Sequence, residues 1–393
     1  MTSRLPAGGT NLFQEIKRRS AEAEKNGQKI IRLSIGQPSG PAFFSARKAA
    51  SEAVLSSDES MHEYQDNGSP GVPNFAQRFV QAHVPRRSLK DAKNVSYLPT
   101  PGNKSMLGIT ILSCNLQPGE TIGTTTKPGY PTPADQARYL KAEQYPLLTN
   151  PTNSFLFRTG DILPGTKLVM MNYPHNPTGQ IAPRGWLKKL CACCEKRGIR
   201  IFNDNPYQLL SYRVKSTPLA EVAPDFPDLS WAEAFSASKV IGNGTGWRVG
   251  AMVGSPDFIA DIATIKSNTD SGFAAPMAVG ALYAIENDQE GIAKRRRTYH
   301  KRIKILIDVL SRHDMEIAID PKAGFFTLWK VPKVAFGQKI KNAEHFNSLM
   351  IENTGIVGVH FDPYIRYSVT GDIEAVSGDI ERAFVKANVS YKG

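Results

Sequence analysis

Cysteine and long apolar runs are both scarce in this chain of 393 residues. No stretch reaches the roughly 18 uninterrupted apolar residues that a transmembrane helix needs, so such a helix is excluded. The basic residues near the start of the chain are not followed by an apolar run, and a secretory signal is therefore not expected. From these absences we expect a cytoplasmic protein without a membrane partner.

Only four cysteines are present, and three of them, Cys191, Cys193 and Cys194, share one predicted helix. No histidine near them completes a familiar zinc spacing, and we expect no metal site. Adjacent positions on a helix also point to different faces, which argues against a tetrahedral site. Together with Cys114, these residues are interpreted as reduced structural thiols, typical of a cytosolic protein.

The sequence also lacks the motifs of nucleic-acid-binding proteins, although its formal net charge is +12. It contains no helix-turn-helix, zinc finger or aromatic RNA-binding pattern. The densest basic cluster, residues 294–302, lies in a predicted amphipathic helix, where a solvated face is the ordinary explanation. We therefore expect no nucleic acid partner and only a general preference for anionic ligands.

Short apolar runs alternate with helical patterns through the middle of the chain. The predicted strands are residues 121–126, 167–171, 200–203 and 251–254, and the predicted helices are residues 104–114, 183–197 and 256–267. This order predicts an α/β fold with a mostly parallel sheet between layers of helices. Ligands bind such a sheet at the carboxyl ends of its strands, where the connecting loops gather.

The pattern changes near residue 287, where a long basic helix leads into two strands and further helices. We expect a large domain, residues 46–286, and a smaller α+β domain made of residues 1–45 and 287–393. No internal repeat and no low-complexity linker is found.

The most informative segment is FSASKVIGNGTGWRVG at residues 235–250. It places Lys239 beside Ser236 and Ser238 and ends a glycine-rich turn at Arg248. An amine can react with an aldehyde, whereas hydroxyl groups and a cation can bind a phosphate. On its own, the segment could equally be a surface lysine beside a loop.

Polar side chains follow two of the predicted strands. Asn176 lies in NYPHNPTGQ after one strand, and Asp204 and Tyr207 lie in FNDNPYQ after the next. An acid there could keep a pyridine nitrogen protonated, which an electron sink requires, while Asn176 and Tyr207 could hydrogen-bond the ring's phenolic oxygen. Each segment also has a simpler explanation when it is taken alone. NPTG is a common turn sequence, and the acid could cap a helix or solubilise a loop.

Taken together, the ordered motifs NPTG, DxPY and SxSK followed by GTGWRVG resemble the class I/II aminotransferases. These are pyridoxal phosphate enzymes of fold type I, and the resemblance extends over nearly the whole chain. It implies a pyridoxal 5'-phosphate cofactor, a homodimer, and an α-amino acid and a 2-oxo acid as small-molecule partners. Three departures concern the site: Lys239 and Arg248 are one residue further apart than is usual, the stretch from Tyr64 to Gly71 is slightly longer than usual, and residues 358–366 are shorter than the usual segment.

The resemblance also implies residue roles. Gly36 in RLSIGQP would lie against the substrate carboxylate, and Arg366 in PYIRYSV would clamp it with a planar guanidinium, with Asn176 also at the substrate. The helix that opens in PTPGNKSMLGIT would bind phosphate, Tyr130 would stack on the cofactor ring, and Tyr64 would reach the phosphate in the partner subunit. The cofactor-binding set is Tyr64, Gly102, Asn103, Lys104, Tyr130, Asn176, Asp204, Tyr207, Ser236, Ser238, Lys239 and Arg248.

The reaction implied is transamination, with Lys239 as the catalytic residue. Lys239 would hold the cofactor as an internal aldimine and then move a proton as general base and acid in a ping-pong cycle. One alternative is a carbon–sulfur β-lyase on the same fold, suggested by His175 in PHNP. A second is a non-catalytic cofactor-binding module.

Overall fold

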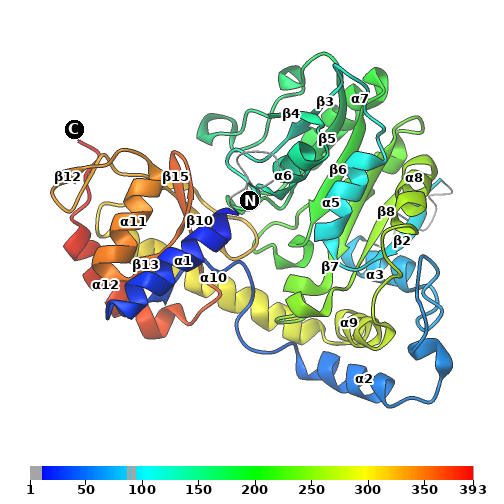
Figure 1. Ribbon diagram of the computed structural model, residues 1–393, viewed down its shortest axis with the longest axis horizontal. Coiled ribbons are helices and arrows are strands. Elements are labelled where there is room, and N and C mark those ends of the chain that lie inside the picture. The colour runs from blue at the N-terminus through cyan, green and yellow to red at the C-terminus, as the bar shows by residue number, and fades with distance from the viewer. Residues whose placement is uncertain (1–10, 86–88, 90–93, 393) are drawn as a thin grey trace, which may run out of the picture.

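A seven-stranded sheet forms the centre of the computed structural model, which describes residues 11–85, 89 and 94–392 (Figure 1). Its strands, in spatial order, are β2 (Ser96–Thr100), β8 (Gly250–Gly254), β7 (Trp231–Ser236), β6 (Arg200–Asn205), β5 (Thr166–Met171), β3 (Thr121–Thr124) and β4 (Glu143–Pro146). Only β8 runs antiparallel to its neighbours, and the remaining adjacent pairs are parallel. The prediction of a mostly parallel sheet is therefore confirmed.

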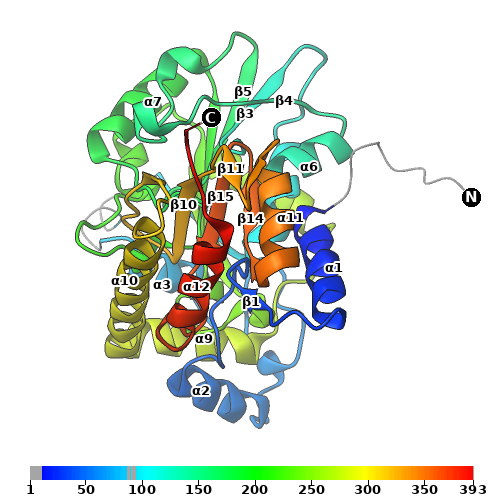
Figure 2. The ribbon, with the colours of Figure 1, turned by 90° about the vertical axis from the view of Figure 1, so that its left-hand side faces the viewer.

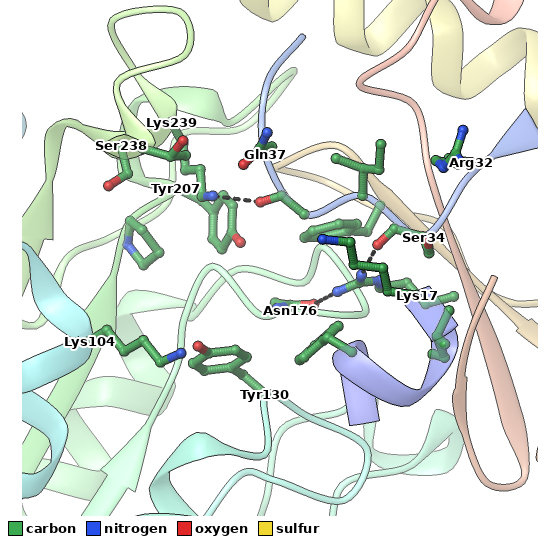
Figure 3. A pocket seen from close by; sticks show the side chains of 18 of the residues that line it. Lys17, Arg32, Ser34, Gln37, Lys104, Tyr130, Asn176, Tyr207, Ser238 and Lys239 are labelled. Carbon is green, nitrogen blue, oxygen red and sulfur yellow. Dashed lines mark hydrogen bonds between the residues drawn. The ribbon is translucent and has the colours of Figure 1, made fainter. Parts of the chain in front are cut away.

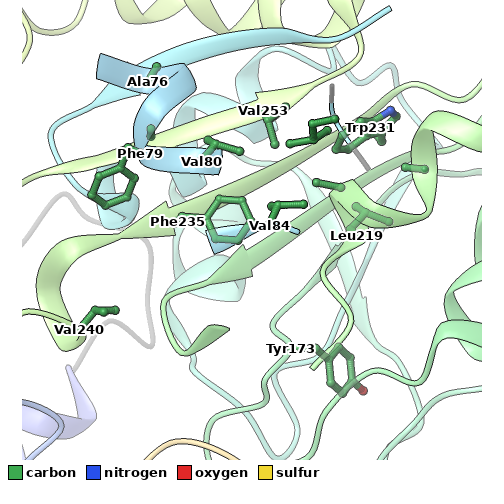
Figure 4. Packing of buried hydrophobic residues seen from close by; sticks show 14 of the residues in the cluster. Ala76, Phe79, Val80, Val84, Tyr173, Leu219, Trp231, Phe235, Val240 and Val253 are labelled. Carbon is green, nitrogen blue, oxygen red and sulfur yellow. The ribbon is translucent and has the colours of Figure 1, made fainter. Parts of the chain in front are cut away.

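Helices cover both faces of this sheet. One face carries α3 (Phe75–His83), α7 (Arg184–Arg197) and α9 (Ala275–Asn287), and the other carries α5 (Asn103–Leu112), α6 (Thr132–Tyr139) and α8 (Pro256–Lys266). Strand β5 shows why both faces need covering, because Leu168 and Met170 pack on the α5 side whereas Val169 packs on the α7 side. Figure 4 shows Phe79 and Val80 of α3 beside Phe235 of β7 in the first of these layers.

A smaller antiparallel sheet lies apart from the large one. Its strands, in spatial order, are β14 (Val359–Phe361), β15 (Tyr364–Ser368), β10 (Phe326–Lys330) and β9 (Ile317–Ile319). The 23-residue helix α10 (Gln289–Ser311) runs from α9 to this sheet, where α11 (Ala343–Thr354) and α12 (Ile373–Ala387) also pack (Figures 1 and 2). The proposed division into domains 46–286 and 1–45 with 287–393 stays a prediction.

The N-terminal segment packs on the smaller sheet region as well. Helix α1 (Leu12–Lys25) begins after Asn11, whose side chain accepts hydrogen bonds from the first backbone N–H groups. Its Ile16 and Ala23 pack against Ile351 of α11 and nearby strand residues. The short strand β1 (Ile31–Arg32) then pairs in parallel with β13 (Ile356–Val357). This places residues 34–37 beside the end of the large sheet.

Two further elements complete the frame: α2 (Phe44–Val54), which packs along α9, and the small hairpin of β11 (Val334–Ala335) and β12 (Gln338–Lys339). Within the described ranges, none of the helices combines the length and apolar character that crossing a membrane would need.

Candidate active site

A cavity of about 1030 Å³ opens at the carboxyl ends of β5, β6 and β7 (Figure 3). Segments from distant parts of the sequence meet there, including α1, residues 34–37 and strand β15. Twelve of the residues predicted from the sequence line it: Gly36, Asn103, Lys104, Tyr130, Asn176, Asp204, Tyr207, Ser236, Ser238, Lys239, Arg248 and Arg366.

Lys239 ends the short 3₁₀ helix η7 (Ala237–Lys239), which continues directly from β7. Its Nζ donates a hydrogen bond to the carbonyl oxygen of Gly36 at 2.5 Å. Burial lowers the pKa of Lys239 to about 8, and the nearby cations Arg366 and Arg248 act in the same direction, whereas Asp204 opposes them. A substantial fraction of this amine is therefore neutral near physiological pH, as a nucleophile or general base requires.

Asp204 lies near the end of β6 with its side chain buried against the cavity. Its Oδ1 accepts a hydrogen bond from Asn103 Nδ2 at 2.7 Å. Burial raises the pKa of Asp204 to about 6, and the bond from Asn103 and the charge of Lys239 oppose that rise. A carboxylate in this position would be stabilised by a cationic N–H donor bound in the cavity.

Donors for an anion gather at the start of α5. Gly102 precedes the helix with φ +77°, and a Cβ atom there would lie 2.4 Å from Nη2 of Arg248. Only glycine therefore lets that guanidinium approach the free amides of the helix N-terminus. The hydroxyl groups of Ser236 and Ser238, 2.9 Å apart, line the same cavity. This combination suits a phosphate group.

The longer spacing between Lys239 and Arg248 is accommodated within the connecting loop. A second 3₁₀ helix, η8 (Thr245–Trp247), follows the glycine-rich turn, and Arg248 itself adopts a left-handed conformation with φ +56°. Its Nη1 donates to the carbonyl oxygen of Thr245 at 2.9 Å. The extra residue thus leaves Arg248 in the cavity wall.

Arg366 of β15 is only 1% exposed. Its Nη1 donates to Oδ1 of Asn176 at 2.9 Å and its Nη2 to the carbonyl oxygen of Ser34 at 2.8 Å. Burial lowers its pKa to about 10. Among the described residues its Nε has no hydrogen-bond partner and no carboxylate pairs with it. A carboxylate ligand would satisfy both the charge and the free N–H group.

Two tyrosines supply aromatic surface to the cavity. Tyr130 precedes α6 and Tyr207 follows β6, and burial raises the pKa of both hydroxyl groups. Figure 3 shows the Lys104 side chain extending toward Tyr130, whereas Tyr207 lies close to Lys239. Both hydroxyl groups therefore stay protonated at neutral pH and can donate hydrogen bonds.

Two of the predicted residues do not line the cavity. Gly102 lies behind Arg248 and acts through its lack of a side chain. Tyr64 is 77% exposed and lies outside the cavity of its own chain. Its contact with a phosphate in a partner subunit stays a prediction.

Asn172 is a cavity residue that the sequence reasoning missed. It directly follows β5, its Nδ2 donates to the carbonyl oxygen of Asp204 at 2.6 Å, and its Oδ1 accepts from the backbone N–H of Asn176 at 2.9 Å. It therefore fixes Asp204 relative to Asn176. An amide side chain directly after a buried strand was the signal that could have found it.

His175, which motivated the lyase alternative, is turned away from the cavity. Its ring is 1% exposed, and its Nδ1 lies 2.8 Å from Oγ1 of Thr178. Burial lowers its pKa to about 4, which leaves it neutral. His175 thus stabilises the NPTG turn through Thr178 and is not one of the residues that line the cavity.

Comparisons with known proteins agree with this geometry. The family model described as "Aminotransferase class I and II" matches residues 28–376. The LL-diaminopimelate aminotransferase of Dehalococcoides mccartyi is 27% identical over 91% of this chain and 92% of its own length. The enzyme of the same name from Syntrophobacter fumaroxidans is 29% identical over 94% of this chain and 95% of its own.

Solved structures share the fold at lower identity. An aspartate aminotransferase from Rhizobium meliloti superposes with a TM-score of 0.86 at 19% identity, over 99% of this chain and 98% of that one. An aspartate aminotransferase from Thermus thermophilus with maleate gives 0.80 at 18% identity, over 98% of each chain. The family match spans both sheets and most of the residues that line the cavity, helix α1 excepted, and the chain belongs to the class I and II aminotransferases.

Proposed function

We propose that this aminotransferase binds pyridoxal 5'-phosphate in the cavity and moves an amino group between an α-amino acid and a 2-oxo acid. One observation carries the proposal: Lys239, Asp204 and Arg366 converge on a single cavity from three separate elements. An amine, a buried acid and a buried arginine without a carboxylate partner among the described residues match the groups of cofactor and substrate.

The residues present fit this cofactor. The amides at the start of α5, the hydroxyl groups of Ser236 and Ser238, and Arg248 would hold its phosphate. Asp204 would pair with the protonated pyridine nitrogen, which relieves the cost of a buried carboxylate. Tyr130, Tyr207 and Asn176 would contact the ring and its phenolic oxygen. When bound, pyridoxal phosphate supplies an aldehyde for amine exchange and a ring that delocalises electrons from the substrate Cα.

The protein's own groups supply binding and proton transfer. Arg366 and Asn176 would bind the α-carboxylate of the substrate and so orient its Cα–H bond. Lys239, with its pKa lowered to about 8, would take the Cα proton as a neutral amine and return it from its protonated form. The Gly36 carbonyl oxygen would keep that amine on the substrate side of the cavity.

The names of the relatives make LL-diaminopimelate a first candidate substrate. They also favour amino transfer over β-elimination, and the position of His175 outside the cavity removes the feature that suggested a lyase.

A homodimer is proposed as well, because Tyr64 is exposed and available to a second subunit. The buried free thiols of Cys191 and Cys194 suit a reducing compartment such as the cytoplasm.

A half-reaction screen tests the function. Protein loaded with pyridoxal phosphate is mixed with single amino acids, its visible spectrum is followed, and the 2-oxo acid released is identified. We expect a spectral change and a stoichiometric 2-oxo acid with at least one amino acid. Catalytic release of pyruvate and ammonia without an acceptor would instead establish the lyase. The absence of any spectral change would contradict both reactions.

A further inference from the structure

One wall of the cavity comes from α1, to which the proposed chemistry assigns no role. The lining residues from this helix are Phe13, Ile16, Lys17, Ser20, Ala21 and Glu24. Their spacing of three and four positions places them along one face of the helix. The packing of Ile16 and Ala23 against Ile351 fixes which face that is. Helix α1 therefore presents a defined row of side chains to whatever enters the cavity.

Lys17 is the charged group of this row that lacks a counter-ion. Among the residues that the structure describes, it forms no hydrogen bond and no ion pair, and its side chain is exposed. Glu24, two turns further along, is neutralised by Arg32 at 2.7 Å. Arg18, which faces away from the cavity, is paired with both Glu15 and Glu22. The α1 wall thus contributes one uncompensated positive charge, at Lys17.

The anions of the proposed reaction are already matched to other cations. Arg248 lies at the phosphate site, and Arg366 is the buried cation available to the α-carboxylate. Figure 3 shows Lys17 reaching into the cavity over Asn176, on the substrate side, whereas Ser238 and Lys104 lie on the opposite side. Lys17 is therefore placed to meet a part of the substrate beyond its α-carbon.

We propose that Lys17 binds a carboxylate at the distal end of the substrate side chain, so that the enzyme prefers acidic amino acids. This inference rests on the proposed aminotransferase function. The flexible four-carbon stem of lysine lets its ammonium follow side chains of different length. Phe13 and Ile16, on the same face of α1, offer apolar surface for the methylene groups between the two carboxylates.

Pairs of substrates that differ in the distal group test the inference. With the cofactor-loaded protein, kcat/KM is measured for glutamate against glutamine, aspartate against asparagine, and LL-diaminopimelate against lysine. Lys17→Met should lower kcat/KM for the preferred acidic member about tenfold, mainly through KM, because one charge-assisted hydrogen bond is lost. The value for its neutral partner should stay within about twofold of wild type.

Three further variants separate charge from shape. Lys17→Arg should keep most of the preference, and Lys17→Glu should shift it toward lysine. Arg18→Met is the matched control, because Arg18 neighbours Lys17 on the solvent side of the same helix. It should leave every substrate ratio unchanged. Equal losses for acidic and neutral substrates in Lys17→Met, or no loss at all, would overturn the inference.

A binding measurement gives a readout that does not depend on turnover. Calorimetric titration of the loaded protein with glutarate and with butyrate compares a dicarboxylate with a monocarboxylate. Glutarate should bind more tightly, and Lys17→Met should remove most of that difference. If glutarate shows no advantage, the inference is wrong even when transamination occurs. If the advantage is seen but no amino acid changes the spectrum, the proposed function fails and the carboxylate site stands.

Discussion

At the scale of single residues, the cavity holds Lys239, Asp204 and Arg366 where burial opposes their charged forms. The pKa of Lys239 falls to about 8 and that of Arg366 to about 10, while that of Asp204 rises to about 6. Each pKa shift arises because burial destabilises the charged form of the group, and a ligand of opposite charge would restabilise that form. The site is therefore prepared for charged ligands before they arrive.

Asp204→Asn should leave the fold intact and lower kcat by about 100-fold or more, because the charge proposed to pair with the pyridine nitrogen of the cofactor would be lost. The measurement is single-turnover spectroscopy with the amino acid found in the half-reaction screen. Asp225→Asn, at an exposed position remote from the cavity, serves as control and should be silent. Full activity in Asp204→Asn would remove the role proposed for this carboxylate.

The reactivity of Lys239 should depend on pH in a direction that its surroundings set. Its amine becomes neutral as the pH rises through about 8, so the rate of cofactor attachment to the apoprotein should rise to that pH and then level off. Arg366→Leu removes a neighbouring positive charge and should move this rise to higher pH. Stopped-flow absorbance measures both profiles. An unchanged midpoint in Arg366→Leu would contradict the coupling.

At the scale of elements, the ends of β5, β6 and β7 show which parts of the candidate site could be predicted from the sequence. Asn176 and Asp204 follow two strands that the sequence predicts, so their meeting at one sheet edge was predictable from local patterns, whereas the strand before Ser236 was not among those predicted. The orientation of α1 was not, because it depends on the contact of Ile16 with Ile351, more than 300 positions away. Lys17 was missed for that reason.

The start of α5 gives a prediction about one backbone position. Gly102→Ala would place Cβ 2.4 Å from the Arg248 guanidinium at a φ of +77°, which an L side chain rarely adopts. We expect at least a tenfold weaker affinity for pyridoxal phosphate, measured by fluorescence titration, because Arg248 must move away. Gly185→Ala in α7 meets open space and should leave the affinity unchanged, with at most a small rise in Tm because alanine favours the helix.

A buried acid links β6 to β7 behind the cavity. Glu233 accepts hydrogen bonds from Asn203 at 2.7 Å, Asn205 at 2.8 Å and the backbone N–H of Ala220 at 2.8 Å. Burial raises its pKa to about 7, against an ordinary value of 4.5. Between these two values the folded protein binds a proton that the unfolded chain has released. The free energy of unfolding should therefore fall as the pH rises through this window.

Glu233→Gln tests that pH dependence, since the amide does not titrate. Denaturant unfolding of wild type should lose on the order of 2 kcal/mol between pH 5 and pH 8, and the variant should lose much less. The variant should also be less stable at pH 5, because the amide nitrogen cannot accept from the Ala220 N–H group. Parallel pH profiles for the two proteins would contradict the assignment.

At the scale of the whole molecule, the predicted fold type I architecture and the predicted aminotransferase activity are confirmed by the family match and by solved aminotransferases. A TM-score of 0.86 at 19% identity means that the layers persist while most side chains differ. The layers are determined by the hydrophobic pattern of the strands, so this part of the fold could be predicted from the sequence. At the substrate end of the cavity, Arg366 of β15 was identified from its motif, whereas the wall formed by α1 depends on non-local packing and could not be predicted.

The proposed dimer leads to a complementation experiment. If Tyr64 completes the site of a partner subunit, Tyr64→Ala and Lys239→Ala should each be nearly inactive alone. Random mixing of the two would create one intact site in half of the dimers and restore about a quarter of wild-type activity. Light scattering checks the dimer itself. No recovery after verified subunit exchange would place Tyr64 outside the partner's site.

The hydrogen bond from Lys239 to Gly36 also has a consequence for the chain that leads from β1 to α2. In the free protein, the reactive amine itself tethers residues 34–37 to the large sheet. Any chemistry that consumes this amine cuts the tether, and the segment then depends on Ser34 and its bond to Arg366. The protection of residues 34–37 therefore depends on whether the Lys239 amine is free or bound to a ligand. Limited proteolysis or amide exchange at residues 34–37 should read out, without a chromophore, whether the amine is engaged.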